Sequence, residues 1–203
     1  MQTALTVRRA DNDLRDGVLA AYAAASVDEA VTAWILEGFP ADMYVEGFAP
    51  AIIDRALSDD EVWIAGTDDE IWAVSLWQHV TSAARFEAEA EVMAERAAAM
   101  PEVSPLRRAA AAMSLLAREH PREFPHRYLQ VIVTMPEHRG KGAGAALIGD
   151  RLKAASDEGV PAFLEASTAR SARLYTRMGF VSDSTAHTLP EDGPTLLPMW
   201  FEG

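Results

Sequence analysis

The period of the hydrophobic pattern changes several times along the chain, and each change predicts a helix or a strand. Short apolar runs rich in β-branched and aromatic residues predict strands, and longer stretches rich in Ala, Glu and Leu predict helices. The predicted strands are residues 3–10, 62–66, 71–77, 128–134, 162–167, 180–189 and 196–201. The predicted helices are 14–25, 28–37, 43–57, two within 82–119, then 145–158 and 168–178. This order indicates a mixed α/β (α+β) fold.

Local signals define the ends of several of these elements. Ser104-Pro105 offers an N-cap followed by a proline at the first helical position. Gly159 is typical of a helix end, and Thr168 or Ser171 can cap the short helix after the strand at 162–167. The chain therefore carries a strand–helix–strand–helix unit in its last third.

The composition is that of a globular protein with a full apolar core. Of the 203 residues, 49% are hydrophobic and 24% are charged, and none is cysteine. Disulfides, zinc–thiolate clusters and thiol nucleophiles are therefore excluded. Charges interrupt the first 14 residues, and no later apolar run is long enough for a membrane span. We expect one cytoplasmic domain over residues 1–203, with no membrane partner.

The charge is unevenly distributed along the chain. The net charge is −13, and residues 1–120 hold 9 basic and 21 acidic side chains, against 9 and 10 in residues 121–203. This acidity argues against a nucleic-acid partner, which would require a basic surface. It favours a cationic small molecule.

A glycine-rich turn separates the strand at 128–134 from the following helix. Gly140, Gly142 and Gly144 would let backbone N–H groups converge on a phosphate at the positive end of that helix, with Arg139 and Lys141 at the rim. The turn also satisfies the dinucleotide pattern G-x-G-x-x-A, so a nicotinamide-dependent oxidoreductase is an alternative. Only one further parallel strand follows, which is too few for a doubly wound sheet.

The same residues carry a resemblance to a known family. Leu129, Ile132, Thr134 and Pro136 precede Arg139-Gly140-Lys141-Gly142-Ala143-Gly144, which resembles the acetyl-CoA motif Q/R-x-x-G-x-G/A of the GCN5-related N-acetyltransferases (GNAT). Residues 174–180, with Tyr175 four residues before Gly179-Phe180, resemble the second signature of the family. Residues 128–203 carry nearly all of the resemblance, which is closest to the puromycin N-acetyltransferase branch.

The resemblance implies the GNAT fold, in which helices flank a central, mostly antiparallel sheet whose parallel strands four (128–134) and five (162–167) splay apart. Acetyl-CoA would bind in the gap. Its pantetheine would lie along Ile132, Val133 and Thr134, and its pyrophosphate would accept hydrogen bonds from Arg139, Gly140, Lys141, Gly142, Ala143, Gly144 and Ala145. Ser171 stands where the family often has an Asn that contacts CoA.

The resemblance also implies the chemistry. An amine would attack the thioester directly, and Tyr175 would protonate the departing thiolate. Glu165 lies among apolar strand residues, where burial would raise its pKa and suit it to accept the proton of the amine. Pairing with Arg127 is the alternative for Glu165. Three histidines, either bases or packing residues, flank the expected acceptor side: His79, His120 and His126.

The helices at 82–119 precede the cofactor strand and would shape the acceptor site. Six aromatic residues could line an acceptor pocket or pack in the core: Trp34, Phe39, Tyr44, Trp72, Trp77 and Phe86. We therefore expect an acetyl-CoA-dependent N-acetyltransferase acting on a small-molecule amine, such as an aminonucleoside or another antibiotic. A non-catalytic acyl-CoA-binding sensor or interaction module is a second alternative. The sequence does not decide whether the protein is a homodimer.

Overall fold

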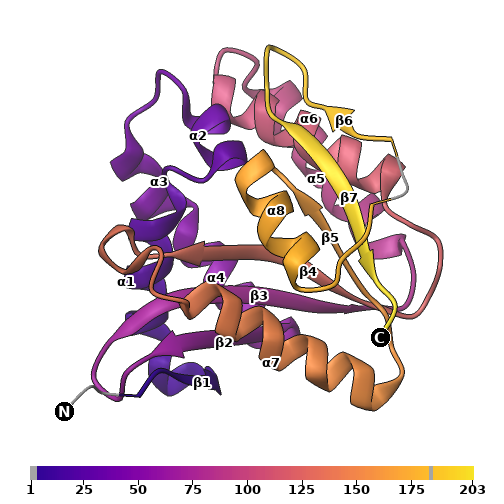
Figure 1. The fold of residues 1–203 in the computed structure, drawn as a ribbon. Coiled ribbons are helices and arrows are strands. Elements are labelled where there is room, and N and C mark those ends of the chain that lie inside the picture. Colours follow the sequence, from indigo (N-terminus) through magenta and orange to yellow (C-terminus); the bar gives the residue numbers. More distant parts are fainter. Residues whose placement is uncertain (1–3, 183–184) are drawn as a thin grey trace.

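The computed structural model describes residues 4–182 and 185–203, and it contains one central sheet of seven strands (Figure 1). The strand order is β1-β2-β3-β4-β5-β7-β6. Within the described chain, every neighbouring pair is antiparallel except β4 and β5, which are parallel. The bounds are β1 (Thr6–Arg9), β2 (Glu61–Gly66), β3 (Ile71–Val80), β4 (His126–Thr134), β5 (Ala162–Ala166), β6 (His187–Thr188) and β7 (Thr195–Phe201).

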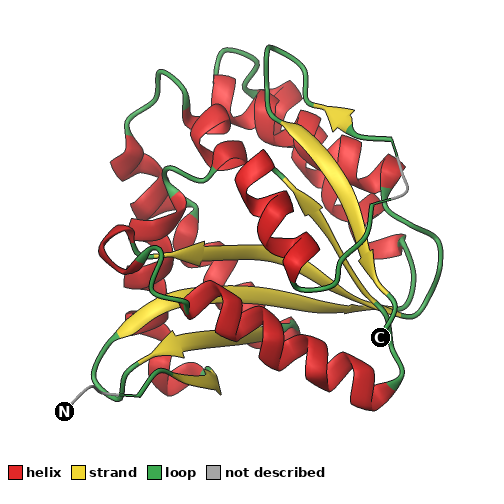
Figure 2. Cartoon of the chain, viewed as in Figure 1, coloured by secondary structure: helices red, strands yellow, loops and turns green. Residues whose placement is uncertain are grey.

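Helices cover both faces of the sheet (Figure 2). They are α1 (Arg15–Ser26), α2 (Ala30–Leu36), α3 (Ala41–Gly47), α4 (Ala49–Asp59), α5 (Ala84–Ala99), α6 (Ser104–Glu119), α7 (Ala143–Glu158) and α8 (Ala169–Arg177), with short 3-10 turns at Asn12–Leu14 and Pro136–His138. The apolar residues of α1 and α4 pack on one face with Ile64, Val74 and Val133, and α5 and α6 continue this layer over Tyr128 and Phe163. Helices α7 and α8 pack on the opposite face.

No single helix in residues 4–182 and 185–203 has both the length and the apolar character needed to cross a membrane. Taken together, Asn12–Ser26 and Ala30–Leu36 pass the same test, but a bend of 77° separates them. The apolar residues of α1, among them Val18 and Tyr22, are buried in the core of the protein.

A β-bulge lies in the middle of β4. Leu76 of β3 is paired with Val131, and the next residue, Trp77, is paired with Leu129, so Gln130 has no opposite residue. An extra residue on one strand bends that strand and increases its twist. Beyond the bulge, β4 stays paired with β3 but diverges from β5.

Most predicted elements are confirmed, and three differ. The single helix predicted at 43–57 is two helices, α3 and α4, because Pro50 cannot donate to Glu46 and its ring crowds the preceding turn. Helix α6 begins at Ser104, so the N-cap is Val103 and not Ser104.

The strand predicted at 180–189 is also mostly wrong. Only His187–Thr188 forms a strand, and Val181 makes an isolated bridge to Trp200. Residues 183–184 of this range, and Thr3 of the first predicted strand, lie outside the described residues.

Candidate active site

The main chains of β4 and β5 separate, as the splayed arrangement predicts, and we call the interval between the two strands the slot. The two strands are paired only at Arg127–Ala162 and Tyr128–Phe163, whereas β5 stays paired with β7 from Ala162 to Ala166. Figure 1 shows β4 and β5 diverging from this point. The edge of β4 from Leu129 to Thr134 therefore has no strand partner on the β5 side within the described residues, and Ile132, Val133 and Thr134 lie along it. An extended, amide-containing ligand could pair with this edge.

The glycine turn leads directly into α7. Gly140 and Gly142 have φ values of +77° and +92°, a conformation that glycine adopts without strain. Gly142 is the N-cap, and the first intrahelical bond runs from the Ala146 N–H to the Gly142 carbonyl at 2.9 Å. The N–H groups of Ala143, Gly144 and Ala145 therefore have no intrahelical acceptor. These donors, at the positive end of a 16-residue helix, form an anion-binding site.

The charged side chains at this turn are already engaged. The Arg139 guanidinium binds both carboxylate oxygens of Asp28 at 2.6 and 2.7 Å, and its Nε donates to the Thr134 carbonyl at 3.1 Å. Arg139 is therefore not the mobile rim charge that the sequence suggested. Lys141 lies 5.6 Å from the Trp72 ring centroid, and Trp72 stacks on His138 with centroids 4.5 Å apart.

Ser171 belongs to the cap of α8. The Thr168 hydroxyl accepts the Ser171 N–H at 3.0 Å, and the Ser171 hydroxyl accepts the Thr168 N–H at 3.2 Å. This reciprocal capping box fixes the start of the helix at the end of β5. The Ser171 hydroxyl thus has a local structural role, and its contact with CoA stays a prediction.

Tyr175 projects from α8 into the core on the α7 side of the sheet. Its side chain is 7% exposed, and it packs with Leu129, Ile148 and Phe180. Burial raises the pKa of its hydroxyl well above the usual value, and the negative charge of Glu29 raises it further. Tyr175 is therefore protonated at neutral pH and suited to act as a proton donor.

Glu165 lies on the opposite face of β5 from Tyr175. Side chains alternate along a strand, so Leu164 and Ala166 face Tyr175 whereas Phe163 and Glu165 face the α5–α6 layer. Burial raises the pKa of Glu165 to about 7, and a hydrogen bond from the Tyr128 hydroxyl partly opposes this shift. The alternative pairing with Arg127 is wrong, because Arg127 binds Glu61 and Glu158 at 2.9 and 2.6 Å.

Glu29 is a site residue that the sequence did not identify. Its carboxylate caps α2 by accepting the N–H groups of Val31 and Thr32 at 3.0 and 3.1 Å. The Ser167 hydroxyl, just beyond β5, donates to the other Glu29 oxygen at 2.8 Å. The neighbouring Asp28 binds Arg139, which is bonded to Thr134 at the end of β4, so the Glu29 carboxylate lies between the ends of β4 and β5, at the mouth of the slot. In sequence it is simply an acidic residue before a helix.

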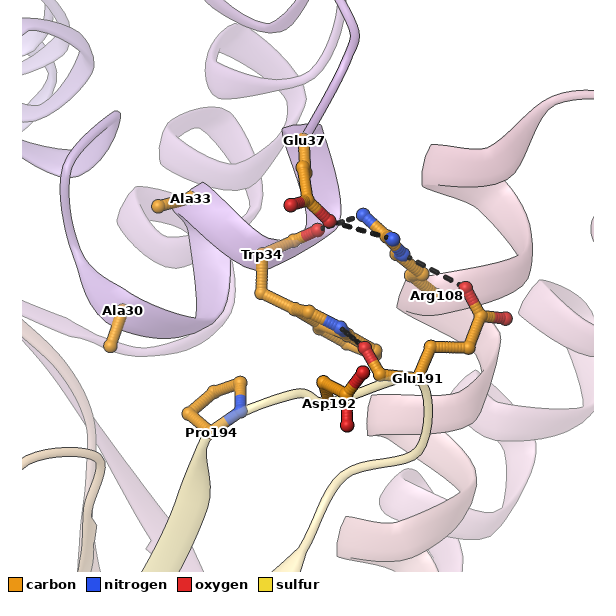
Figure 3. A pocket seen from close by; sticks show the side chains of 8 residues that line it. All are labelled: Ala30, Ala33, Trp34, Glu37, Arg108, Glu191, Asp192 and Pro194. Atoms are coloured by element: carbon orange, nitrogen blue, oxygen red, sulfur yellow. Dashed lines mark hydrogen bonds and ion pairs between the residues drawn. The ribbon is translucent and has the colours of Figure 1, made fainter.

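A cavity of about 560 Å³ is lined at one end by Ala30, the residue that follows Glu29 (Figure 3). It lies between α2, α6 and the turn that joins β6 to β7. Eight residues line it: Ala30, Ala33, Trp34, Glu37, Arg108, Glu191, Asp192 and Pro194. Trp34 is thus the one member of the predicted aromatic set that the structure places in this cavity.

The other candidate aromatic residues and histidines have separate surroundings. Tyr44, Trp77 and Phe86 pack in three different core clusters. His120 and His126 are buried together, with their Nε2 atoms 2.9 Å apart, and stack among aromatic rings. These two histidines are packing residues, not bases, and His79 is exposed. Phe39 is half-buried.

Comparison with known proteins agrees with this geometry. Residues 84–180 match the model of the acetyltransferase (GNAT) family. Residues 128–180 of this match include the slot, the glycine turn and Tyr175. Residues 84–180 therefore carry an acetyltransferase region of the GNAT type. The doubly wound sheet of the oxidoreductase alternative is ruled out for the described chain, because only β4 and β5 are parallel.

Solved structures of acetyltransferases have the same fold. A histone acetyltransferase HPA2 and related acetyltransferase from Corynebacterium glutamicum is 22% identical, with a TM-score of 0.68 and coverage of 97% of this chain and 95% of that chain. The polyamine N-acetyltransferase of Drosophila melanogaster, which forms N-acetylagmatine, is 18% identical, with a TM-score of 0.66 and coverage of 98% and 100%. Arylalkylamine N-acetyltransferase 2 of Aedes aegypti is 16% identical, with a TM-score of 0.69 and coverage of 97% of each chain.

Proposed function

We propose that this protein transfers an acetyl group from acetyl-CoA to the nitrogen of a small-molecule amine, and that residues 1–203 act as one catalytic domain. The observation that carries the proposal is the slot itself. An unpaired β4 edge leads to three free N–H donors at the start of α7. A ligand that joins extended amides to a diphosphate fits both features: the amides would pair with the β4 edge, and the diphosphate would bind the N–H donors of α7.

The donor would be held mainly by the backbone. The Met135 N–H bonds the Trp72 carbonyl of β3, and main-chain groups alternate along an antiparallel strand, so those of Ile132 and Thr134 would face the slot and those of Val133 face β3. At the turn, the N–H groups of Ala143, Gly144 and Ala145 would bind the diphosphate, whereas the Lys141 N–H donates to the His138 carbonyl at 3.3 Å. When bound, acetyl-CoA supplies an activated acetyl thioester. No protein atom lies within 4 Å of a Cβ built at Gly140 or Gly142, so the space beside the turn at these two residues is open.

Tyr175 and the acidic residues would move protons on opposite sides of β5. Tyr175 is protonated and faces the α7 side, so it would deliver a proton to the thiolate that leaves. Glu165 faces the other side, and its pKa of about 7 suits a group that accepts a proton from an amine near neutral pH. Glu29, hydrogen-bonded by Ser167 at the mouth of the slot, is the second candidate base.

The amine class is supported by charge and by similarity of fold. The net charge of −13 favours cationic acceptors over anionic ones. Two of the structures with the same fold are N-acetyltransferases of polyamines and arylalkylamines. An aminonucleoside acceptor, which the puromycin branch would imply, belongs in the same substrate panel.

The test is acetyl transfer by Tyr175→Phe. CoA release is followed with a thiol reagent, and the protein adds no background because it has no cysteine. We expect kcat to fall by about 100-fold or more, as for the loss of a general acid. Acetyl-CoA affinity, measured by calorimetry, should stay within a factor of two.

The matched control is Tyr44→Phe. This substitution also removes a buried hydroxyl, but at a residue of the α1–α4 core. In the wild type, the Tyr44 hydroxyl donates to the Tyr22 hydroxyl at 3.0 Å. This variant should keep its kcat and lose only stability. An absence of CoA release by the wild type over a broad amine panel, together with tight acetyl-CoA binding, would refute the proposal.

A further inference from the structure

The cavity beside Glu29 has no part in the donor site or in the proton transfers described above. It extends along α2 from Ala30, the residue that follows Glu29, to Glu37 (Figure 3). Because a helix rises 1.5 Å per residue, these two ends are about 10 Å apart. The cavity therefore begins at the residue next to Glu29, the second candidate base, and continues along α2 away from that residue.

The lining of the cavity carries an excess of negative charge. Three carboxylates and one guanidinium line it, which gives a formal charge of −2. Arg108 bonds Glu37 at 2.9 Å and Glu191 at 3.1 Å, and Arg107, outside the cavity, bonds Glu191 at 3.0 Å. Asp192 forms no ion pair and no side-chain hydrogen bond with the described residues. Among the three carboxylates that line the cavity, Asp192 is therefore the one available to bind a ligand.

The turn that carries Asp192 is held rigidly against α2. The Trp34 indole donates to the Glu191 carbonyl at 3.2 Å. A Cβ on Gly193 would come within 2.8 Å of the Trp34 ring, so only glycine allows this close approach. Glu191 and Asp192 have φ values of +52° and +55°. Two consecutive non-glycine residues in this strained conformation indicate that the surrounding contacts fix the turn.

We propose that the cavity is a subsite for a second cationic group on the acceptor, so that the preferred substrate is a diamine or a guanidino-amine. This inference rests on the proposed function. The reacting nitrogen must be neutral to attack, whereas an amine or guanidine at the far end stays protonated at neutral pH. Asp192 would bind that distal cation, and Ala30 and Ala33 would contact the methylene chain between the two nitrogens. Arg108 does not attract an anion here, because two carboxylates already neutralise it.

The experiment compares substrate pairs on the complete protein. Acetylation is measured for aliphatic diamines with three to six methylenes, for agmatine, and for the n-alkylamine of matched length. The wild type should have a kcat/KM at least threefold higher for the dication than for its matched monoamine at low salt. This preference should diminish in 0.5 M NaCl, because an exposed charge pair is screened.

Asp192→Asn tests the assignment. Asn, like Asp, tolerates a positive φ, so the turn should fold normally. We expect kcat/KM for the dication to fall by about threefold to fivefold, the usual range for an exposed charge pair, with the monoamine value unchanged. Asp13→Asn removes the same charge in the 3-10 turn before α1 and should change neither value.

Each outcome separates the two proposals. No transfer to any amine would overturn the proposed function. Transfer with equal preference for monoamines and dications would leave that function standing and overturn the subsite. An equal loss in Asp192→Asn and Asp13→Asn would also overturn the subsite, because the preference would then arise from the overall charge of the protein.

Discussion

The pH dependence of acetyl transfer should reveal the pKa of Glu165. Burial on the α5–α6 side raises this pKa to about 7. A group with that pKa is about 90% protonated at pH 6 and about 10% protonated at pH 8. If the carboxylate accepts the proton of the amine, the contribution of Glu165 to kcat/KM should therefore rise by about tenfold between these two pH values.

The assay is the ratio of wild-type kcat/KM to that of Glu165→Gln, measured from pH 5.5 to 9 with one amine. The amine titrates equally in both reactions, so its own protonation cancels in the ratio. The ratio should rise with a midpoint near pH 7. Tyr128→Phe gives an independent check: its hydroxyl stabilises the carboxylate, so its removal should move the midpoint to higher pH.

Two results would refute this reasoning. A ratio that stays flat across the range would remove Glu165 from proton transfer. If acetyl transfer persists in Glu165→Gln and is lost in Glu29→Gln, the base is Glu29. Glu29→Gln keeps an oxygen that can cap α2, so the helix should stay folded in this variant.

Three further predictions concern stability and donor binding. Burial, and then the charge of His126, lower the pKa of His120 to about 3. Because the unfolded chain binds this proton near pH 6.5, stability is complete above that pH and is lost as the pH falls toward 3. The wild type should lose about 2 to 3 kcal/mol between pH 7.5 and 4.5 from this group, and His120→Gln should lose correspondingly less in urea unfolding. Gly142→Ala places a Cβ at a φ of +92° and should destabilise the protein by about 1 to 2 kcal/mol, whereas Gly144→Ala, which has ordinary contact distances, should not. Asp28→Asn should release Arg139, strengthen CoA binding by up to about threefold in calorimetry, and change the free energy of unfolding by less than about 1 kcal/mol. An unchanged CoA affinity in Asp28→Asn would mean that Arg139 does not reach the diphosphate.

The sequence predicted the parts of the site that depend on local signals. The glycines at 140 and 142, the strand before them and the helix after them are adjacent in the chain, so turn chemistry and periodicity suffice to find them. The position of Tyr175 followed from its spacing to Gly179-Phe180. Most of the sheet was also predictable, because its strands are short apolar runs between polar turns.

Contacts between distant segments could not be predicted in this way. The bulge at Gln130 and the early end of β4–β5 pairing depend on how three strands fit together, and no single strand carries that information. Glu29 reaches Ser167, 138 residues away, and Trp34 reaches Glu191, 157 residues away. The Arg139–Asp28 pair spans 111 residues and changes the role that an arginine beside a glycine turn suggested.

The open edge of β4 has a consequence for what this protein can recruit. A strand with unsatisfied main-chain groups normally invites addition of a foreign strand, and so aggregation. Here the edge lies between helical layers, with α7 and α8 on one side, and α1 and α4, continued by α5 and α6, on the other. A foreign strand would have to pass between these layers to reach β4, so the helices that enclose the proposed donor site also hinder edge-to-edge association.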